Sequence, residues 1–170
     1  IIISGPIGEH AISVLSKREG IDFKTAVKSD SQPLNTLTSK ALKVSGKVRF
    51  MRDPTRGGLA TTLNEIVRDA HFGISIDEDK LPIKKSVREP CELLGLDPLY
   101  LACEGRVIMV LGKEDEERVL NAMKKYSSGR LAASIGSVIG NYKGKVYLHT
   151  FAGGKRILDM LSGEQLPRIC

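Results

Sequence analysis

The sequence contains no tryptophan, and it has only 3 cysteines, 4 phenylalanines and 4 tyrosines. The cysteines are Cys91, Cys103 and Cys170, and they form neither a CxxC pair nor a cluster with histidine. Zinc sites and disulfide frameworks need such spacings, so neither is predicted. We therefore expect reduced thiols.

Long apolar runs are also missing. The longest, residues 107–111, is far shorter than the ~20 residues of a membrane-spanning helix, and no signal segment opens the chain. We expect a cytoplasmic protein without membrane association. The formal net charge of +6 comes from Lys and Arg scattered among Asp and Glu. Without a basic stripe this charge does not favour nucleic acid, and a polyanion such as ATP explains it equally well.

A chain of 170 residues is long enough for one domain with its own hydrophobic core. It begins with three isoleucines and no methionine, which suggests a strand cut from a longer chain. Apolar spacing predicts strands and helices that alternate without strict order, in one domain without repeats, which is typical of an α+β fold with a mixed sheet. The expected strands are 1–3, 48–51, 73–76, 106–111 and a hairpin of 132–139 with 145–150. The expected helices are 10–17, 34–44, 59–70, 87–94, 114–125 and 155–161.

The stretch DPTRGGLATTLNE, residues 53–65, joins an expected strand to an expected helix through a glycine turn. Gly57 and Gly58 let the backbone approach a ligand, and Arg56 can grip phosphate oxygens. Asp53 can bind Mg²⁺ or cap the turn, and Thr55 can contact phosphate or cap the helix. The pattern is not a Walker A motif. A phosphate site and an ordinary capped helix both remain open.

Two further stretches contain candidate residues. In SGPIGEH, Gly5, Gly8 and His10 are candidates for binding a cofactor, although glycine and proline also punctuate ordinary turns. In CEG, Glu104 precedes the most apolar strand next to a glycine. A carboxylate in that place can be a general base or the partner of a salt bridge.

The chain ends at Cys170, a thiol with nothing after it. We predict that residues 163–170 form a flexible arm, which extended could span up to ~26 Å. Such an arm suits a carrier, in which one enzyme loads the sulfur and the arm delivers the cargo to another site. An accidental terminal cysteine is the alternative.

Four stretches in order, SGPIGEH, DPTRGGLATTLNE, CELLGLDPLYLACEG and LPRIC, resemble the C-terminal half of the HypE family of hydrogenase maturation proteins. The resemblance implies a three-layer α/β/α domain with a mixed sheet over residues 1–162, like the C-terminal domain of the aminoimidazole ribonucleotide synthetase superfamily. It also implies a carrier tail over 163–170. The family's N-terminal ATP and Mg²⁺ domain would be absent from this chain.

The resemblance implies a chemistry as well. In this family a HypF-type carbamoyltransferase carbamoylates the terminal cysteine, ATP drives dehydration to a thiocyanate, and the cyanide passes to iron on a HypC–HypD scaffold. Carried over, Cys170 is the carrier and Glu104 helps to deprotonate the carboxamide nitrogen. The family's phosphate and Mg²⁺ signature falls on Asp53, Thr55, Arg56, Gly57, Gly58 and Asn64.

Some features depart from the family pattern. Pro6 stands where relatives commonly have Thr, and Cys103 where they often have Asn. In this family the missing N-terminal half supplies acidic Mg²⁺ ligands, much of the ATP site and the main contacts of a homodimer. We therefore expect this piece to fold but to have little or no ATPase activity alone. Two other functions stay open, a non-catalytic carrier module and a small-molecule kinase of the same superfamily.

Overall fold

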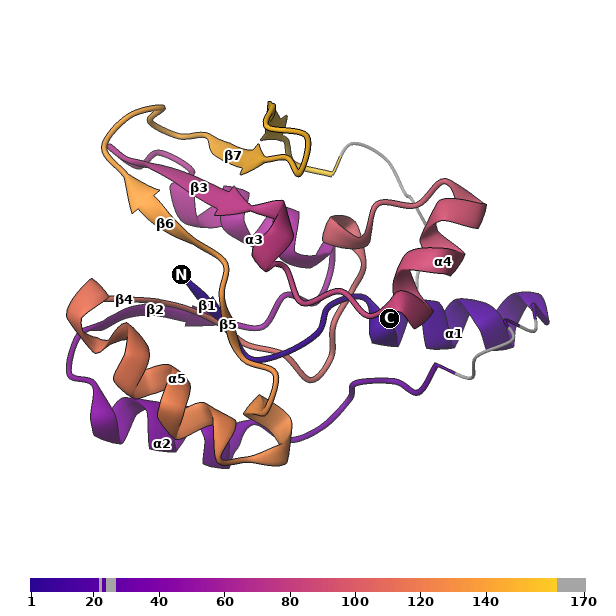
Figure 1. Ribbon diagram of the computed structural model, residues 1–170, viewed down its shortest axis with the longest axis horizontal. Coiled ribbons are helices and arrows are strands. Elements are labelled where there is room, and N and C mark those ends of the chain that lie inside the picture. Colours follow the sequence, from indigo (N-terminus) through magenta and orange to yellow (C-terminus); the bar gives the residue numbers. More distant parts are fainter. Residues whose placement is uncertain (22, 24–26, 162–170) are drawn as a thin grey trace.

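The computed structural model of this protein describes residues 1–21, 23 and 27–161, and it has an α+β fold (Figure 1). The helices are α1 Glu9–Glu19, α2 Asn35–Val44, α3 Gly58–Val67, α4 Lys85–Leu94 and α5 Glu116–Lys124. The strands are β1 Ile2–Ile3, β2 Val48–Arg52, β3 Gly73–Asp77, β4 Ile108–Leu111, β5 Ala133–Ser134, β6 Gly136–Ile139, β7 Val146–His149 and β8 Lys155–Leu158.

The strands form two four-stranded sheets. The first has the order β2-β4-β1-β5 and is antiparallel throughout. The second has the order β6-β3-β7-β8 and is mixed, because β3 and β7 run parallel while the other pairs are antiparallel. The predicted α+β class with a mixed sheet is therefore confirmed, and the strands divide between two sheets.

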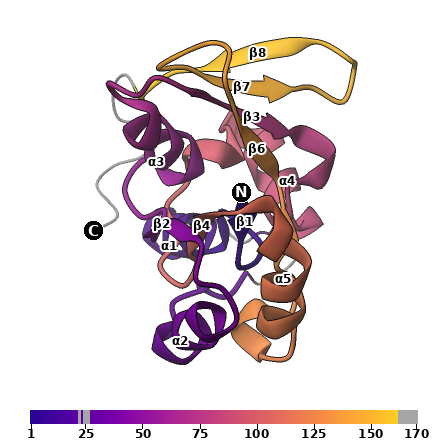
Figure 2. The same cartoon turned by 90° about the vertical axis from the view of Figure 1, so that its left-hand side faces the viewer.

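The first sheet is covered on both faces. Neighbouring residues in a strand point to opposite sides, so its strands contribute to a core cluster on each face. Ile2 lies opposite Met109, and both belong to the core cluster that includes Leu37 of α2 and Val119 of α5. Ile3 pairs with Ile108 on the other face, in the cluster that α3 and the second sheet complete. Figure 2 shows these layers, with α2 and α5 on one side of the sheet and α3 with the second sheet on the other.

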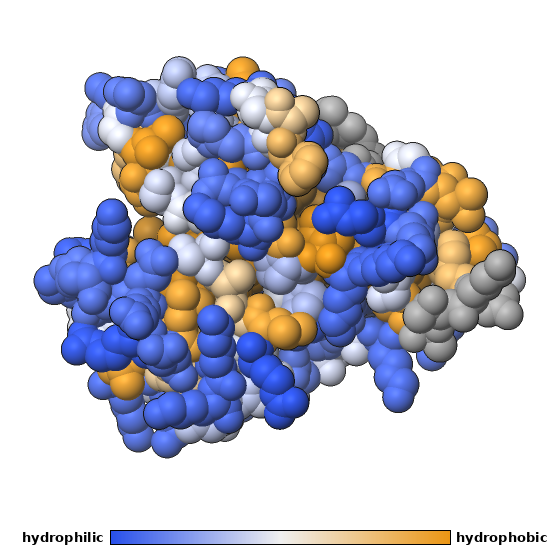
Figure 3. Space-filling view, viewed as in Figure 1, coloured by the Kyte–Doolittle hydropathy of each residue, from blue (hydrophilic) through white to orange (hydrophobic). Residues whose placement is uncertain are grey.

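A third core cluster joins α1 to α4. It contains Ile12 of α1, Val87 and Cys91 of α4, and Leu101 from the segment that leads to β4. On the face drawn in Figure 3, apolar residues gather in the middle between hydrophilic upper and lower parts. None of the helices in the described ranges is long and apolar enough to cross a membrane.

Two predicted elements were wrong. Residues 132–139 and 145–150 do not pair as a hairpin, because β6 and β7 lie on opposite sides of β3. Residues 155–161 do not form a helix. The segment contains β8, which pairs with β7 so that Leu158 lies opposite Val146, and both side chains are buried. Gly153, at φ 82°, makes the tight turn between these strands, which a helical pattern does not reveal.

Candidate functional site

The three glycine-containing motifs leave the first sheet at the same end. Ile108 is the first residue of β4, and it has a partner on each side. Arg52, the last residue of β2, pairs with it on one side, and Ile3, the last residue of β1, pairs with it on the other. The loop after β2, the loop after β1 and the segment before β4 therefore emerge next to one another. These are DPTRGG, SGPIG and CEG.

The CEG segment lies between the other two motifs and bonds to both. The backbone N–H of Cys103 donates to the carbonyl of Pro54 at 3.0 Å. The thiol sulfur of Cys103 accepts the N–H of Gly8 at 3.3 Å. Glu104, which follows directly, is half-buried and donates its N–H to Oδ1 of Asp30 at 3.0 Å. The structure thus brings together Gly8, the loop after β2 and Glu104. The sequence predicted each of them as a candidate but not that they lie close to one another.

The glycines of DPTRGG are required by the backbone. Gly57 and Gly58 have φ of 74° and 62°, a left-handed conformation that favours glycine. A Cβ on Gly58 would lie 2.6 Å from the carbonyl oxygen of Leu101 and 2.7 Å from that of Leu99. This close approach fixes the start of α3 against the segment that leads to Glu104.

The N-terminus of α3 has features of a phosphate site. Its N-cap, Gly57, offers no side chain, so no side-chain bond caps the helix. The first N–H groups of a helix attract anions. Asp53 and Arg56 are exposed beside this end and Thr55 is half-buried.

In the other glycine turn, Gly8 caps α1 with φ 81°, and a Cβ there would lie 2.9 Å from Cγ1 of Val87. A Cβ on Gly5 would lie 3.2 Å from Nε of Arg106. The ring of His10 shares a hydrogen bond of 2.8 Å between Nδ1 and Oγ of Ser29. Close packing therefore accounts for both glycines.

Asn64 is not brought to this end of the sheet. Its amide nitrogen donates to the carbonyl of Ala60 and to the carbonyl of Leu158, both at 2.9 Å. It therefore ties α3 to β8. Cys170 and the predicted tail, residues 163–170, lie outside the described residues.

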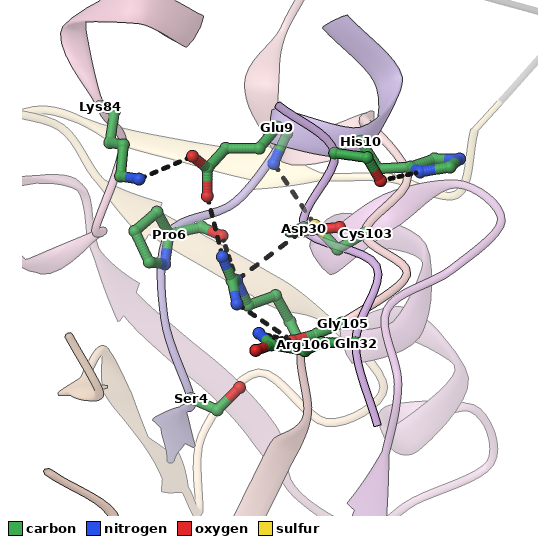
Figure 4. Close-up of polar contacts among 12 residues, drawn as sticks. Ser4, Pro6, Glu9, His10, Asp30, Gln32, Lys84, Cys103, Gly105 and Arg106 are labelled. Carbon is green, nitrogen blue, oxygen red and sulfur yellow. Dashed lines mark hydrogen bonds and ion pairs between the residues drawn. The ribbon is translucent and has the colours of Figure 1, made fainter. Parts of the chain in front are cut away.

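Sequence reasoning missed a buried charge network centred on Arg106, which Figure 4 shows. The guanidinium donates to the carbonyl of Pro6 at 2.7 Å, to that of Gly105 at 3.0 Å and to Glu9 at 2.8 Å. The other oxygen of Glu9 accepts from Lys84 at 2.7 Å. Glu9 lies inside SGPIGEH and Arg106 directly follows CEG, so a charged residue within one motif and another next to the second were the available signal.

A polar cavity of about 320 Å³ opens beside this network. Its lining includes Ser4 and Pro6 of the glycine turn, Glu9, Asp30 and Arg106. The side chain of Asp30 is fully buried, and Oδ2 lies 3.6 Å from Nε of Arg106. Burial raises the pKa of Asp30, while the Glu104 N–H and the Arg106 charge oppose that rise. The cavity thus joins the glycine turn to the charge network.

The two described cysteines do not suit a carrier role. Burial raises the pKa of Cys103 from 9.0 to about 12, and that of Cys91 from 9.0 to about 11. The thiolate is the nucleophilic form, so buried thiols of this kind are inert near neutral pH. Among the three cysteines, Cys170 is left as the candidate.

No group of three or more His, Cys, Asp or Glu side chains within residues 1–21, 23 and 27–161 is placed to hold a metal ion. Asp53 is a single exposed carboxylate. Mg²⁺ at phosphate sites is usually held by one or two carboxylates together with phosphate oxygens and water. Asp53 fits such a partial site and no more.

Comparison with known proteins gives the family. The family described as "AIR synthase related protein, C-terminal domain" matches residues 1–149, so the chain belongs to this family. Two curated relatives named carbamoyl dehydratase HypE, from Cupriavidus necator and Azotobacter vinelandii, are 48% and 47% identical over 170 residues. These matches cover 100% of this chain and 48% and 50% of the relatives. The chain thus spans about half the length of the curated relatives it matches.

Solved structures agree. A structure of the hydrogenase maturation protein HypE has a TM-score of 0.93 at 45% identity, covering 99% of this chain and 55% of that chain. A HypE structure in complex with ATP has a TM-score of 0.92 at 44% identity, covering 99% of this chain and 52% of that chain. A structure of a HypE–HypF complex has a TM-score of 0.89 at 41% identity, covering 94% of this chain and 52% of that chain. The predicted resemblance to the C-terminal half of HypE is confirmed.

A kinase of low sequence identity shares the fold alone. Thiamine monophosphate kinase from Aquifex aeolicus is 16% identical with a TM-score of 0.53, covering 86% of this chain and 48% of that chain. Identity this low shows a shared architecture, and function has to be argued from the site.

Proposed function

We propose that this chain provides the carrier cysteine and part of the catalytic pocket of an ATP-dependent carbamoyl dehydratase, which makes cyanide for the iron of [NiFe]-hydrogenases. The observation that carries the proposal is the position of CEG. Cys103 bonds to the loop after β2 and to Gly8, so Glu104 lies where the two glycine motifs meet. Relatives 48% and 47% identical are named carbamoyl dehydratase HypE, which supports the same reaction.

The substrate in this proposal is the carboxamide on the sulfur of Cys170. An amide oxygen is a poor leaving group, so ATP first transfers its terminal phosphoryl group to that oxygen and the nitrogen loses one proton. The C–O bond then breaks, phosphate leaves with its electrons, and the nitrogen loses its second proton. The products are a thiocyanate on Cys170, ADP and phosphate.

We assign roles in these steps to several residues of the three motifs. Glu104 accepts protons from the nitrogen as general base. Arg56 and the N-terminal turn of α3, which has no side-chain cap, bind phosphate oxygens and stabilise the charge that develops on them. Asp53 is the carboxylate that would hold Mg²⁺, which when bound neutralises phosphate charge. Gly5, Gly8 and His10 contribute to binding the nucleotide in this proposal, and of these Gly5 lines the polar cavity.

The proposal includes partners and further chain. A solved complex joins HypE to HypF, which supports a HypF-type carbamoyltransferase as the enzyme that loads Cys170. A HypE structure holds ATP, which supports ATP as the co-substrate. A HypC–HypD iron scaffold would receive the cyanide, and a homodimer would form through an N-terminal half. Without that half we expect this chain to release little ADP.

A serine variant tests the proposal. Cys170→Ser and Cys91→Ser are assayed with an N-terminal HypE half, the carbamoyltransferase, carbamoyl phosphate and ATP. We expect Cys170→Ser to abolish cyanide formation, and Cys91→Ser to retain it because Cys91 is buried in α4. Normal cyanide formation by Cys170→Ser would refute the proposal. Loading of Cys170 without ATP-dependent dehydration would instead identify a carrier module. ATP turnover that does not depend on Cys170 would identify a kinase.

A further inference from the structure

Asp30 holds the backbone of Glu104 from a segment far away in the sequence. It lies in the stretch before α2, and it is 6% exposed. Its Oδ1 accepts the N–H of Glu104 at 3.0 Å, a contact that joins residues 74 positions apart. A hydrogen bond to an ionised carboxylate is stronger than one between neutral groups.

We infer that Asp30 is a positioning residue for Glu104, and that Arg106 in turn holds Asp30 in place. This inference rests on the proposed role of Glu104 as the base. It assigns a role to two residues that the family motifs do not include. Asp30 acts through the backbone of Glu104 and does not itself contact the substrate.

The packing around Gly105 supports this inference. A Cβ on Gly105 would lie 1.8 Å from the carbonyl oxygen of Asp30, so the two backbones are in direct contact. The amide of Gln32 also donates to the carbonyl of Gly105 at 3.2 Å. The stretch from Asp30 to Gln32 is therefore packed against Glu104 and Gly105 at several points.

The charges around Arg106 supply the second support. Its guanidinium bonds to Glu9, lies 3.6 Å from Oδ2 of Asp30 and donates to the carbonyls of Pro6 and Gly105. One side chain thus connects the SGPIG turn, the CEG segment and the stretch that contains Asp30. Oδ2 of Asp30 is buried and accepts no hydrogen bond from the described residues, so the ion pair with Arg106 is its compensation.

The test uses Asp30→Ala, the conservative Asp30→Asn and the matched control Asp115→Ala, in a protein of the relatives' length. Asp115 is also a buried aspartate, at 5% exposure, and it accepts from Ser45 at 2.6 Å in another part of the molecule. Two quantities are measured, hydrogen exchange of the Glu104 amide and the kcat and KM of dehydration.

We expect Asp30→Ala to accelerate exchange of the Glu104 amide and to lower kcat by about 10- to 100-fold, because a base displaced by ~1 Å loses that much. The KM for ATP stays unchanged. Asp30→Asn keeps an oxygen acceptor for the Glu104 N–H but loses the ion pair with Arg106, so its kcat should lie between the values of Asp30→Ala and the parent. Asp115→Ala lowers stability and leaves kcat unchanged.

Three results separate the possible failures. If Asp30→Ala exposes the Glu104 amide but lowers kcat no more than Asp115→Ala does, the positioning role is wrong and the proposed function stands. If the Glu104 amide stays protected in Asp30→Ala, the positioning role is also wrong. If Glu104→Gln dehydrates at the normal rate, the proposed base is wrong, and with it the inference that depends on it.

Discussion

The contact between Gly58 and residues 99–101 gives a quantitative prediction for Gly58→Ala. An L-residue in the left-handed region costs about 1–2 kcal/mol. Gly58 has φ 62°, and its new Cβ would also lie within 2.7 Å of three backbone atoms, in Leu99, Tyr100 and Leu101. Backbone cannot move aside as a flexible side chain can, so overpacking adds about 1–3 kcal/mol. We expect a total loss of about 2–5 kcal/mol in the free energy of unfolding.

Gly95→Ala is the matched control. Gly95 ends α4 with φ 66°, and a Cβ there would meet nothing within 4 Å. It should therefore lose only the conformational cost of about 1–2 kcal/mol. Urea unfolding of both variants and the parent chain gives the two losses from the transition midpoints. Equal losses for the two variants would refute the claim that α3 begins in contact with the segment before Glu104.

Three other predictions concern the same region. Arg106→Met should cost about 3–5 kcal/mol in the free energy of unfolding, because buried Asp30 loses its ion pair with Arg106, and buried Glu9 keeps the contact with Lys84 but loses the one with Arg106. Lys47→Met, which removes an exposed ion pair with Glu114, should leave the urea midpoint unchanged, and equal effects of the two variants would contradict the network. Burial raises the pKa of Cys103 from 9.0 to about 12, so the folded state holds that proton more tightly than the unfolded state does. The contribution of this thiol to the free energy of unfolding should therefore be fully present below about pH 9 and be lost as the pH rises through about 9–12. Urea midpoints measured across this range should fall less steeply in Cys103→Ala than in the parent chain. Asn64→Ala should lose about 1–2 kcal/mol through its bond to Leu158 and leave the KM for ATP unchanged, whereas a raised KM would show that Asn64 binds the nucleotide.

Much of the fold could be predicted because local patterns and tertiary packing agree. The run VIMVL predicted a buried strand, and residues 108–109 of β4 are indeed buried on both faces between the helical layer and α3. The glycine loop DPTRGG predicted a strand-to-helix turn, which β2 and α3 form.

The failures have a physical reason too. The partner of a strand is set by packing at long range, so neither the separation of β6 from β7 by β3 nor the pairing of β8 with β7 follows from periodicity. The charge network joins Glu9 to Arg106 across 97 positions. Each of these side chains alone resembles an ordinary surface charge, and only the fold shows that they are buried together.

The most direct measurement is the mass of the C-terminal peptide that ends in Cys170, taken after incubation with the carbamoyltransferase, carbamoyl phosphate and ATP, without and with the N-terminal half. We predict a carbamoyl adduct on Cys170 without the N-terminal half, and a loss of one water from that adduct when the N-terminal half is present. An unmodified Cys170 in a mixture that still produces cyanide would contradict the carrier role of this sulfur.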